Sequence, residues 1–488
     1  MAAKTTLNAK NLEALGAQRL AELLIEISTG SAAHKRRLRM EIAGTHSSAD
    51  VSREVRKRLS SIMRARTFID WRKVKAMKTD LETQRKTIVA TVAPHDPVEA
   101  FELIWQFLAV ADPLFGRSDD GSGSLIQSFH QACIDAGAIA KAANIDIDVL
   151  AEKIFKALQD NGYGQFDRLI TAMIPTLEND GLRRLRALFV TWSKEPKEKA
   201  RKTDRTVMGW SSAGAIYEDE LYGNHNDLTI RIALQEIADA LGDVDAYIAQ
   251  QPEKTHAAPM VAADIAHRLV SAGRAEEALK ALDKVDTSGR TDVPFEWELA
   301  RIEVLEALGR GEEAQAFRWR CFEQSLNDEH LRAYVRRLPD FDDLEAEAKA
   351  FSYAQAFPNV HRALHFFLRW PSPAEAANLV MKREAELDGD LYGLMTAVAD
   401  ALSAKYPLPA TVVLRSMIDF TLRSGRSSRY KHAARHLAEC RSLASQIKDF
   451  GSIQSNDAYV ACLKREHGRK SGFWSLAQWS QPAIASVL

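Results

Sequence analysis

The sequence predicts an all-α fold, a tetratricopeptide-like helical-repeat α-solenoid preceded by an N-terminal helical region. Three observations indicate this class: apolar residues recur at helical spacing along most of the 488 residues, Pro is scarce at 15, and a Gly-Arg motif repeats in the C-terminal half. Apolar side chains three and four positions apart share one face of a helix. Because repeat arrays grow by stacking helix pairs, a chain of this length need not form several separate cores.

The N-terminal part, residues 1–192, is expected to be a helical domain. A first helix is predicted over Leu12–Ile27, and a continuous, strongly basic helix over residues 51–78. Pro97 opens another helix, since a proline in the first turn lacks only an N–H that would be unpaired there. The polar run FGRSDDGSGS at residues 115–124 predicts a loop, with further helices up to residue 192.

Residues 193–226 are expected to form a linker or an irregular connection. The run SKEPKEKARKTDR has no apolar periodicity, and GWSSAG and YGNHND are rich in turn-forming residues. The repeat domain then covers residues 227–488 and ends in a C-terminal cap. No convincing strand is predicted in either half.

The repeat signal is carried by two Gly-Arg pairs. Gly273-Arg274 and Gly309-Arg310 lie 36 residues apart, within the same pattern Leu-x3-Gly-Arg-x2-Glu-Ala. This spacing is close to the 34-residue tetratricopeptide period. Glycine ends the first helix of a pair because it adopts positive φ without a Cβ clash, and the glutamate then favours the start of the second helix. The pattern becomes degenerate after residue 330, where the repeat register is left open.

The charge is distributed unevenly. The net charge is -1, but residues 34–78 carry fourteen Lys or Arg against four Asp or Glu. Such a segment can bind phosphates in a salt-dependent way, or it can be a solvated face that pairs with the acidic remainder. Phe68 and Trp71 lie at helical spacing, which favours core positions over base-stacking platforms. The candidate partner contacts in this segment are Arg56, Lys57, Arg58, Arg64, Arg66 and Lys73.

A second cationic run lies near the C-terminus. Arg469 and Lys470 stand beside Phe473 and Trp474. Together they could contact a phosphate or a peptide, with Arg469, Lys470 and Trp474 as the candidate residues. The alternative is a capping turn whose aromatic side chains close the last repeat.

Two groups of residues have metal-ligand character. His432, His436 and Cys440 stand at positions i, i+4 and i+8 of one predicted helix and could bind zinc, although Cys440 also fits an inward apolar stripe. Asp119 and Asp120 in the Gly-rich loop could bind Mg²⁺ or Ca²⁺ through carboxylate oxygens. Asp120 could equally cap the helix that starts near residue 124.

No catalytic motif was found, because the phosphate-binding, dinucleotide, nucleophile-elbow and HExxH patterns are all missing from the sequence. Four scattered cysteines form no CxxC pair, and no apolar run approaches the length of a membrane span. We therefore expect a soluble cytoplasmic protein that needs no cofactor and does not bind membranes.

Several stretches resemble an uncharacterised bacterial family, a domain of unknown function. They are LGAQRLAELLIEIS and HKRRLRMEIAG near the start, RKRLSSIMRARTFIDWRKVKA, RSDDGSG, and HAARHLAEC with YVACLKREHGRKSGFW near the end. The C-terminal part is similar to the helical-repeat region of SWIM zinc-finger proteins, but the finger itself is missing. The resemblance implies a helical-repeat fold in a cytosolic bacterial protein and implies no activity.

The leading hypothesis is a non-enzymatic α-solenoid scaffold that binds a protein or peptide partner. The alternative is a nucleic-acid-associated protein that docks through residues 34–78. A metal-dependent enzyme that uses the Asp119–Asp120 pair or the His432 helix is a weaker third possibility. Oligomeric state and partner identity are outside what one sequence indicates.

Overall fold

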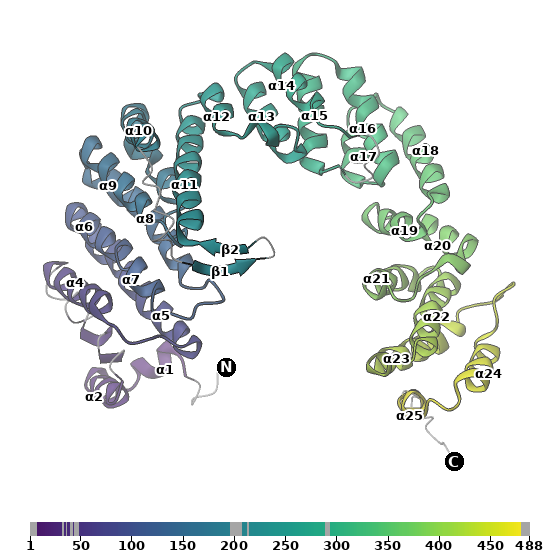
Figure 1. Ribbon diagram of the computed structural model, residues 1–488. Helices are drawn as coiled ribbons and strands as arrows, with labels where there is room; N and C mark the ends of the chain where they lie inside the picture. Colours follow the sequence, from purple (N-terminus) through teal and green to yellow (C-terminus); the bar gives the residue numbers. More distant parts are fainter. Residues whose placement is uncertain are drawn as a thin grey trace. The chain divides into compact units, whose positions relative to one another are not determined.

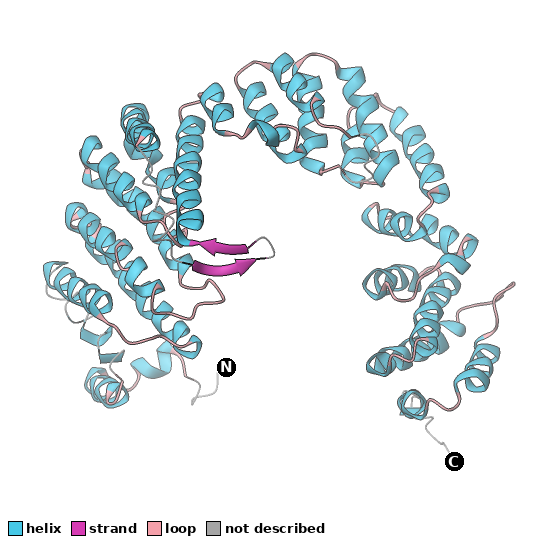
Figure 2. Ribbon diagram, in the orientation of Figure 1, coloured by secondary structure: helices cyan, strands magenta, loops and turns pink. Residues whose placement is uncertain are grey.

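The computed structural model describes residues 7–31, 34–35, 37–39, 42, 48–195, 207–211, 214–287 and 293–479. These residues are almost entirely helical, with one short hairpin (Figures 1 and 2), which confirms the predicted all-α helical-repeat class. Contacts between Cα atoms divide the chain into unit 1, Met1–Thr255, and unit 2, His256–Leu488. None of the described helices combines the length and apolar character needed to cross a membrane.

Unit 1 consists mainly of helices that pack on the next helix in the chain or on the one after it. Its elements are α1 (Ala9–Glu13), α2 (Ala17–Ser28), α4 (Ser48–Arg64), α5 (Trp71–Thr87), a π-helical turn (Ile88–Val92), α6 (Pro97–Leu108), α7 (Ala111–Phe115), α8 (Ile126–Ala143), α9 (Ile147–Gln159), α10 (Leu169–Lys194), β1 (Val207–Ser211), β2 (Gly214–Tyr217), α11 (Glu218–Ala240) and α12 (Val244–Gln250). Helix α6 packs on α8, α8 and α9 pack on α10, and α10 packs on α11. Phe101, Phe107, Phe129 and Phe189 are fully buried between them.

The predicted continuous helix over residues 51–78 is wrong, because the structure has two helices there, α4 and α5. Asp70 caps α5 by accepting a hydrogen bond from the backbone N–H of Arg72 at 2.9 Å. Just before it, Ile69 forms a parallel bridge with Ser118, far along the chain. The stretch RARTFI between the helices contains no Gly or Pro, so a contact distant in sequence ends α4 there. The predicted first helix is likewise two helices, α1 and α2, separated at Gly16, which has φ 78°.

A two-stranded antiparallel hairpin was not expected from the sequence. Strands β1 and β2 pair with Trp210 opposite Ala215 and Ser211 opposite Gly214. The expectation of no strand is therefore wrong for residues 207–211 and 214–217. Five residues are too few for alternation to stand out from the turn-rich composition around them. Helix α11 begins directly after β2, inside the range 193–226 that was expected to be irregular.

Unit 2 continues as helix pairs. Its elements are α13 (Pro259–Ser271), α14 (Ala275–Asp283), α15 (Phe295–Ala307), α16 (Gly311–Ser325), α17 (Asp328–Val335), α18 (Asp342–Ala356), α19 (Val360–Arg369), α20 (Pro373–Lys382), α21 (Tyr392–Ser403), α22 (Pro407–Arg423), α23 (Tyr430–Ala444), α24 (Asn456–His467) and α25 (Ser471–Trp479). Helix α13 packs on both α14 and α15, and α22 packs on α21 and α23.

The glycines of the repeated motif end helices as expected. Gly273 follows α13 with φ 74°, and Gly309 follows α15 with φ 72°. After each glycine, the arginine N–H donates to a carbonyl five residues earlier, at 2.8 Å for Arg274 and 2.9 Å for Arg310. This is the hydrogen bond of a Schellman helix end, which only a residue tolerant of positive φ permits.

The rest of the motif fixes the start of the second helix in each pair. The Arg274 guanidinium donates two hydrogen bonds to Glu277, at 2.8 and 2.7 Å. Arg310 and Glu313 repeat the same arrangement at 2.6 Å. The alanine that follows each glutamate is fully buried, so the small side chain lies where two helices approach each other.

Candidate functional site

The candidate site in unit 1 is a cavity of about 650 Å³ beside α4 and α5, which we call the cationic pocket. Apolar side chains supply part of its wall, among them Ile62, Phe68, Ile69 and Met77. The polar lining comes from α4, α5, the segment before α4 and the loop after α7. Apolar pockets with a few convergent polar groups are the usual form of a binding site.

The loop after α7 is held against the α4–α5 connection. The Ile69 N–H donates to the Arg117 carbonyl at 2.8 Å, and the Asp119 N–H donates to the Ile69 carbonyl at 2.9 Å. The side chain of Arg117 then donates to the carbonyls of Thr67 at 2.9 Å and Ile62 at 3.1 Å. The sequence-predicted loop thus brings a cation to the pocket from about fifty residues along the chain.

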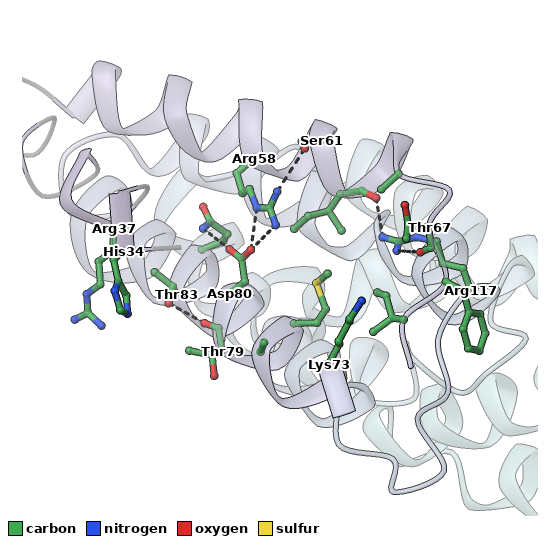
Figure 3. A pocket seen from close by; sticks show the side chains of 17 residues that line it. His34, Arg37, Arg58, Ser61, Thr67, Lys73, Thr79, Asp80, Thr83 and Arg117 are labelled. Atoms are coloured by element: carbon green, nitrogen blue, oxygen red, sulfur yellow. Dashed lines mark hydrogen bonds and ion pairs between the residues drawn. The ribbon is translucent and has the colours of Figure 1, made fainter. Parts of the chain in front are cut away.

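Positive charge dominates the lining. Among the described residues of the lining, four are Lys or Arg (Arg37, Arg58, Lys73 and Arg117) and one, Asp80, has a carboxylate. Figure 3 shows Arg58 and Asp80 pointing toward each other, and the Arg58 Nε donates to Asp80 Oδ2 at 2.9 Å. His34 also lines the pocket.

Arg58 and Arg117 repel each other in the pocket, and the pKa of Arg117 reflects this. Burial lowers the pKa of Arg117, and repulsion from Arg58 lowers it further. The Nε of Arg117 is buried without a hydrogen-bond partner among the described residues, as is the Oε1 of Gln84 in the same lining. An anion that entered the pocket would relieve both the repulsion and the unsatisfied donor.

Of the other predicted contacts in the basic segment, one is neutralised internally. Arg56 donates to both oxygens of Glu99, at 2.8 and 2.9 Å. Lys57, Arg64 and Arg66 are exposed, and only Arg58 and Lys73 of the predicted set line the pocket.

The expectation that Phe68 and Trp71 are core residues is wrong. Phe68 is 62 % exposed and Trp71 is 63 % exposed. Both stand at or after the break between α4 and α5, so the helical spacing that predicted an inward face does not apply to them. The guanidinium of Arg72 lies 5.2 Å from the centre of the Trp71 ring.

The family of the chain follows from its sequence as a whole. A sequence model of a family of unknown function, DUF6880, matches residues 2–476. The chain belongs to this family. No curated protein matches it. Among solved structures, it is similar to a "circular tandem repeat protein with novel repeat topology and enhanced subunit contact surfaces", at 14 % identity over 95 % of this chain and 93 % of that chain, with a TM-score of 0.12.

In this DUF6880 member, Asp120 serves the loop that contains it. Its Oδ1 accepts hydrogen bonds from the Ser122 hydroxyl at 2.9 Å and the Ser124 N–H at 3.0 Å, and its Oδ2 accepts from the Leu125 N–H at 2.7 Å. Burial alone would raise the pKa of Asp120, but these hydrogen bonds lower it overall. Asp119 is exposed beside it. These hydrogen bonds hold the loop that leads into α8 and occupy both Asp120 oxygens, whereas Leu125, the N-cap residue of α8, has no side-chain capping bond.

Of the three candidate residues on α23, His436 and Cys440 are buried in unit 2, whereas His432 is exposed. His436 is 1 % exposed, with its Nδ1 3.1 Å from Glu439 and its Nε2 3.2 Å from the Tyr392 hydroxyl. His432 packs its ring against Tyr392. Burial raises the pKa of the Cys440 thiol to about 12, which keeps it protonated. The structure thus places Cys440 in the apolar stripe and does not gather the three side chains.

The C-terminal residues close unit 2. Phe473 is fully buried and packs edge-on against Tyr430. The Trp474 indole N–H donates to the carbonyl of His467 at 3.0 Å. Arg469 is exposed and Lys470 is half-buried at the turn between α24 and α25.

Among the residues that the structure describes, one group brings three metal-ligand side chains within 4.8 Å of one another, and no sequence pattern indicated it. It consists of Glu298, Cys321 and His330 in unit 2. Asp80, which completes the cationic pocket, was also missed, because its partner Arg58 lies on another helix.

Proposed function

We propose that this protein is a non-enzymatic helical-repeat protein that binds an acidic segment of a protein partner in the cationic pocket. The observation that carries the proposal is the charge of the lining, four Lys or Arg against one carboxylate beside an apolar wall. An acidic peptide with an apolar side chain is complementary to both features. We also propose that the protein is bacterial and cytoplasmic, and that its repeats are similar to those of SWIM zinc-finger proteins.

Preorganisation supports the proposal. Arg58 is held by Asp80, and Arg117 is held by two backbone carbonyls, so neither side chain must be ordered when a ligand binds. Ordering a long side chain at an interface costs about 0.5–1.5 kcal/mol. The exposed amino group of Lys73 stands at the same cavity and supplies a further charge.

The test uses a fluorescent peptide in which glutamates flank a leucine or phenylalanine, with the full chain titrated against it. We expect saturable binding that weakens with added salt. Lys73→Glu is expected to lower the affinity by about tenfold, equivalent to roughly 1.4 kcal/mol. Lys75→Glu is the matched control, because Lys75 is exposed on the same helix but does not line the pocket.

Equal losses in the two variants would mean that the peptide responds to the general charge of unit 1 and not to the pocket. Unchanged affinity in Lys73→Glu would place the binding elsewhere. A peptide with lysines in place of the glutamates controls for apolar attraction and is expected not to bind.

A second candidate function rests on the exposure of Phe68 and Trp71. Exposed aromatic rings in a segment that also has exposed cations such as Arg66 offer stacking and phosphate contacts to a single-stranded nucleic acid. Trp71→Ala would then weaken binding of a short single-stranded oligonucleotide, by about 1–3 kcal/mol for one stacked base. Phe341→Ala, at an aromatic 84 % exposed in unit 2, is the control. No loss in Trp71→Ala removes this candidate.

A further inference from the structure

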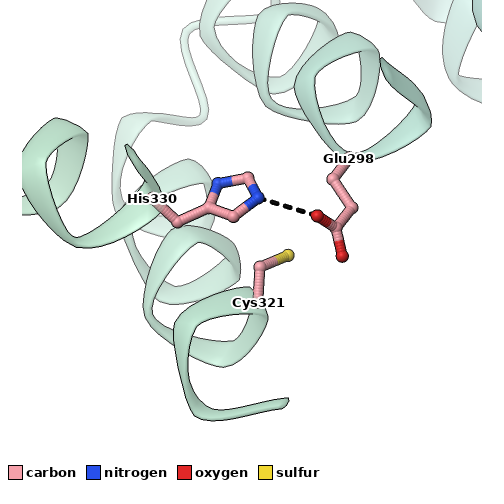
Figure 4. A group of neighbouring side chains, drawn as sticks. All are labelled: Glu298, Cys321 and His330. Carbon is pink, nitrogen blue, oxygen red and sulfur yellow. Dashed lines mark hydrogen bonds and ion pairs between the residues drawn. The ribbon is translucent and has the colours of Figure 1, made fainter. Parts of the chain in front are cut away.

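Three side chains from consecutive helices of unit 2 meet in its interior. Glu298 comes from α15, Cys321 from α16 and His330 from α17. One ligand atom from each lies within 4.8 Å of the other two, and His330 Nε2 is 2.7 Å from Glu298 Oε2. Figure 4 shows the imidazole and the carboxylate pointing toward each other, with the thiol sulfur beside them.

All three side chains are removed from bulk water. Cys321 and His330 are each 1 % exposed and Glu298 is 8 % exposed. Burial raises the pKa of Cys321 far above its usual range, and the adjacent Glu298 raises it further. The thiol is therefore neutral in the metal-free protein, which argues against a role as a nucleophile.

We propose that Glu298, Cys321 and His330 bind one divalent cation of the zinc class. The set offers one sulfur, one nitrogen and one oxygen, the ligand types that zinc takes in proteins. A thiolate and a carboxylate with a neutral imidazole would balance the two positive charges of the ion. A neutral centre avoids the large cost of burying net charge.

The distances suit such a site after a small adjustment. Metal–ligand bonds of about 2.0–2.3 Å in a tetrahedron separate the ligand atoms by roughly 3.3–3.8 Å. The three atoms already lie within 4.8 Å. Small rotations of the side chains would bring the Cys321 sulfur closer to the other two atoms and would replace the 2.7 Å contact between His330 and Glu298, drawn in Figure 4, by the longer separation of two metal ligands.

A neighbouring cavity provides access and a fourth ligand. It has a volume of about 230 Å³ and is lined by Glu298 and Cys321, together with Arg301 and Arg320. Water from this cavity could complete a tetrahedron, as in sites with three protein ligands. As the sulfur–metal bond forms, the Cys321 proton leaves to solvent, so binding releases protons and weakens as the pH falls.

The positive charges of Arg301 and Arg320 near the cavity weaken the binding of a cation, so the ligands must supply enough negative charge to offset them. Arg301 is paired with Asp283 at 2.7 Å, which offsets much of its charge. Arg320 is exposed, and its guanidinium lies 5.8 Å from the Phe317 ring. Formation of the thiolate is therefore required for tight binding, and hard cations that prefer oxygen are expected to bind poorly.

The test uses the full chain, stripped with a chelator and then titrated with Co²⁺ or Zn²⁺. We expect one ion per chain by elemental analysis after dialysis, a thiolate-to-cobalt charge-transfer band, and proton release on zinc binding. Cys321→Ser is expected to remove the band and lower the zinc affinity at least tenfold. Cys440→Ser, which also replaces a fully buried helical cysteine, is the control and is expected to change neither.

Absence of a stoichiometric ion in the folded wild-type chain would overturn the proposal and would leave the trio as a hydrogen-bonded part of the core. A band that persists in Cys321→Ser would overturn it as well. Where Cys321→Ser fails to fold by circular dichroism, the isosteric Glu298→Gln decides by the same titration. Unchanged zinc affinity in Glu298→Gln contradicts the site, and at least a tenfold loss supports it.

Discussion

Glu236 on α11 makes the stability of unit 1 depend on pH. Burial raises the pKa of this carboxyl from 4.5 to about 7, and the negative charge of Asp167 adds to the effect. Asp239 also raises it, whereas Arg168 lowers it. Because the folded-state pKa lies above the ordinary value, folding favours the protonated form. The contribution of Glu236 to the free energy of unfolding is therefore complete below pH 4.5 and is lost as the pH rises through its folded-state pKa of about 7.

The magnitude follows from the shift. A rise from 4.5 to about 7 corresponds to roughly 3.4 kcal/mol at about 1.36 kcal/mol per unit. Glu236 is only half-buried, so solvent screening reduces this ceiling, and we expect about 1–2 kcal/mol. Glu236→Gln replaces the carboxyl with a neutral group of the same shape. The variant should be more stable than the wild type by that amount at about pH 8 and should match it at about pH 4.

The assay is urea unfolding followed by circular dichroism at several pH values, with hydrogen exchange of α10 and α11 to assign the change to unit 1. Glu253→Gln, at an exposed glutamate of the same unit, is the control. The reasoning is refuted if the stability difference between the wild type and Glu236→Gln is the same at both ends of the pH range.

Two further predictions concern the close contact of Gly137 with Ala172 and the hydrogen bonds of Asp120 in the loop before α8, both in unit 1. Gly137→Ala should destabilise the protein by about 1–3 kcal/mol, because the added Cβ would lie 2.1 Å from the Ala172 carbonyl oxygen. The control is Gly311→Ala in unit 2, where the added Cβ has no neighbour within 4 Å and the urea midpoint should stay unchanged or rise slightly. Asp120→Ala should cost about 1 kcal/mol at neutral pH through loss of the hydrogen bonds that hold the loop before α8, while Asp119→Ala should cost much less. Equal midpoints within either pair of variants, measured by urea unfolding, would contradict the corresponding prediction.

The parts of the fold that were predicted correctly depend on local signals. Around the Gly-Arg motifs at residues 273–274 and 309–310, the helix end, the capping hydrogen bond and the Arg–Glu pair all lie within nine residues, 269–277 and 305–313. Such interactions are encoded by neighbours in the chain, so one sequence is sufficient to indicate them. The apolar periodicity of α19 to α24 is local in the same sense.

The parts that were missed depend on contacts between distant residues. Helix α4 ends at Arg64, just before the segment in which Ile69 forms a bridge with Ser118. Residues 65–70 contain no Gly or Pro that would indicate a helix end from the sequence. That error also placed Phe68 and Trp71 on the wrong face, because their helical phase was counted through the break.

The two candidate sites illustrate the same limit. Glu298 and His330 lie 23 and 9 residues from Cys321, a spacing that matches no metal-binding motif. Only the stacking of α15, α16 and α17 brings them together. In the cationic pocket, the sequence identified Arg58 and Lys73 as candidates but could not indicate that Arg117 joins them from the loop.

The pairing of the basic segment explains why its charge remains available at the pocket. Arg56 is neutralised by Glu99 on α6, away from the cavity, so it reduces the general attraction for polyanions. Arg58 pairs with Asp80, the one acid among the described residues of a lining that also has three other Lys or Arg side chains. A ligand carboxylate would therefore meet fixed and incompletely neutralised donors, a condition that favours one short acidic group over a long phosphate backbone. This difference is why Lys73→Glu and Lys75→Glu, which change the net charge equally, should affect the acidic peptide unequally.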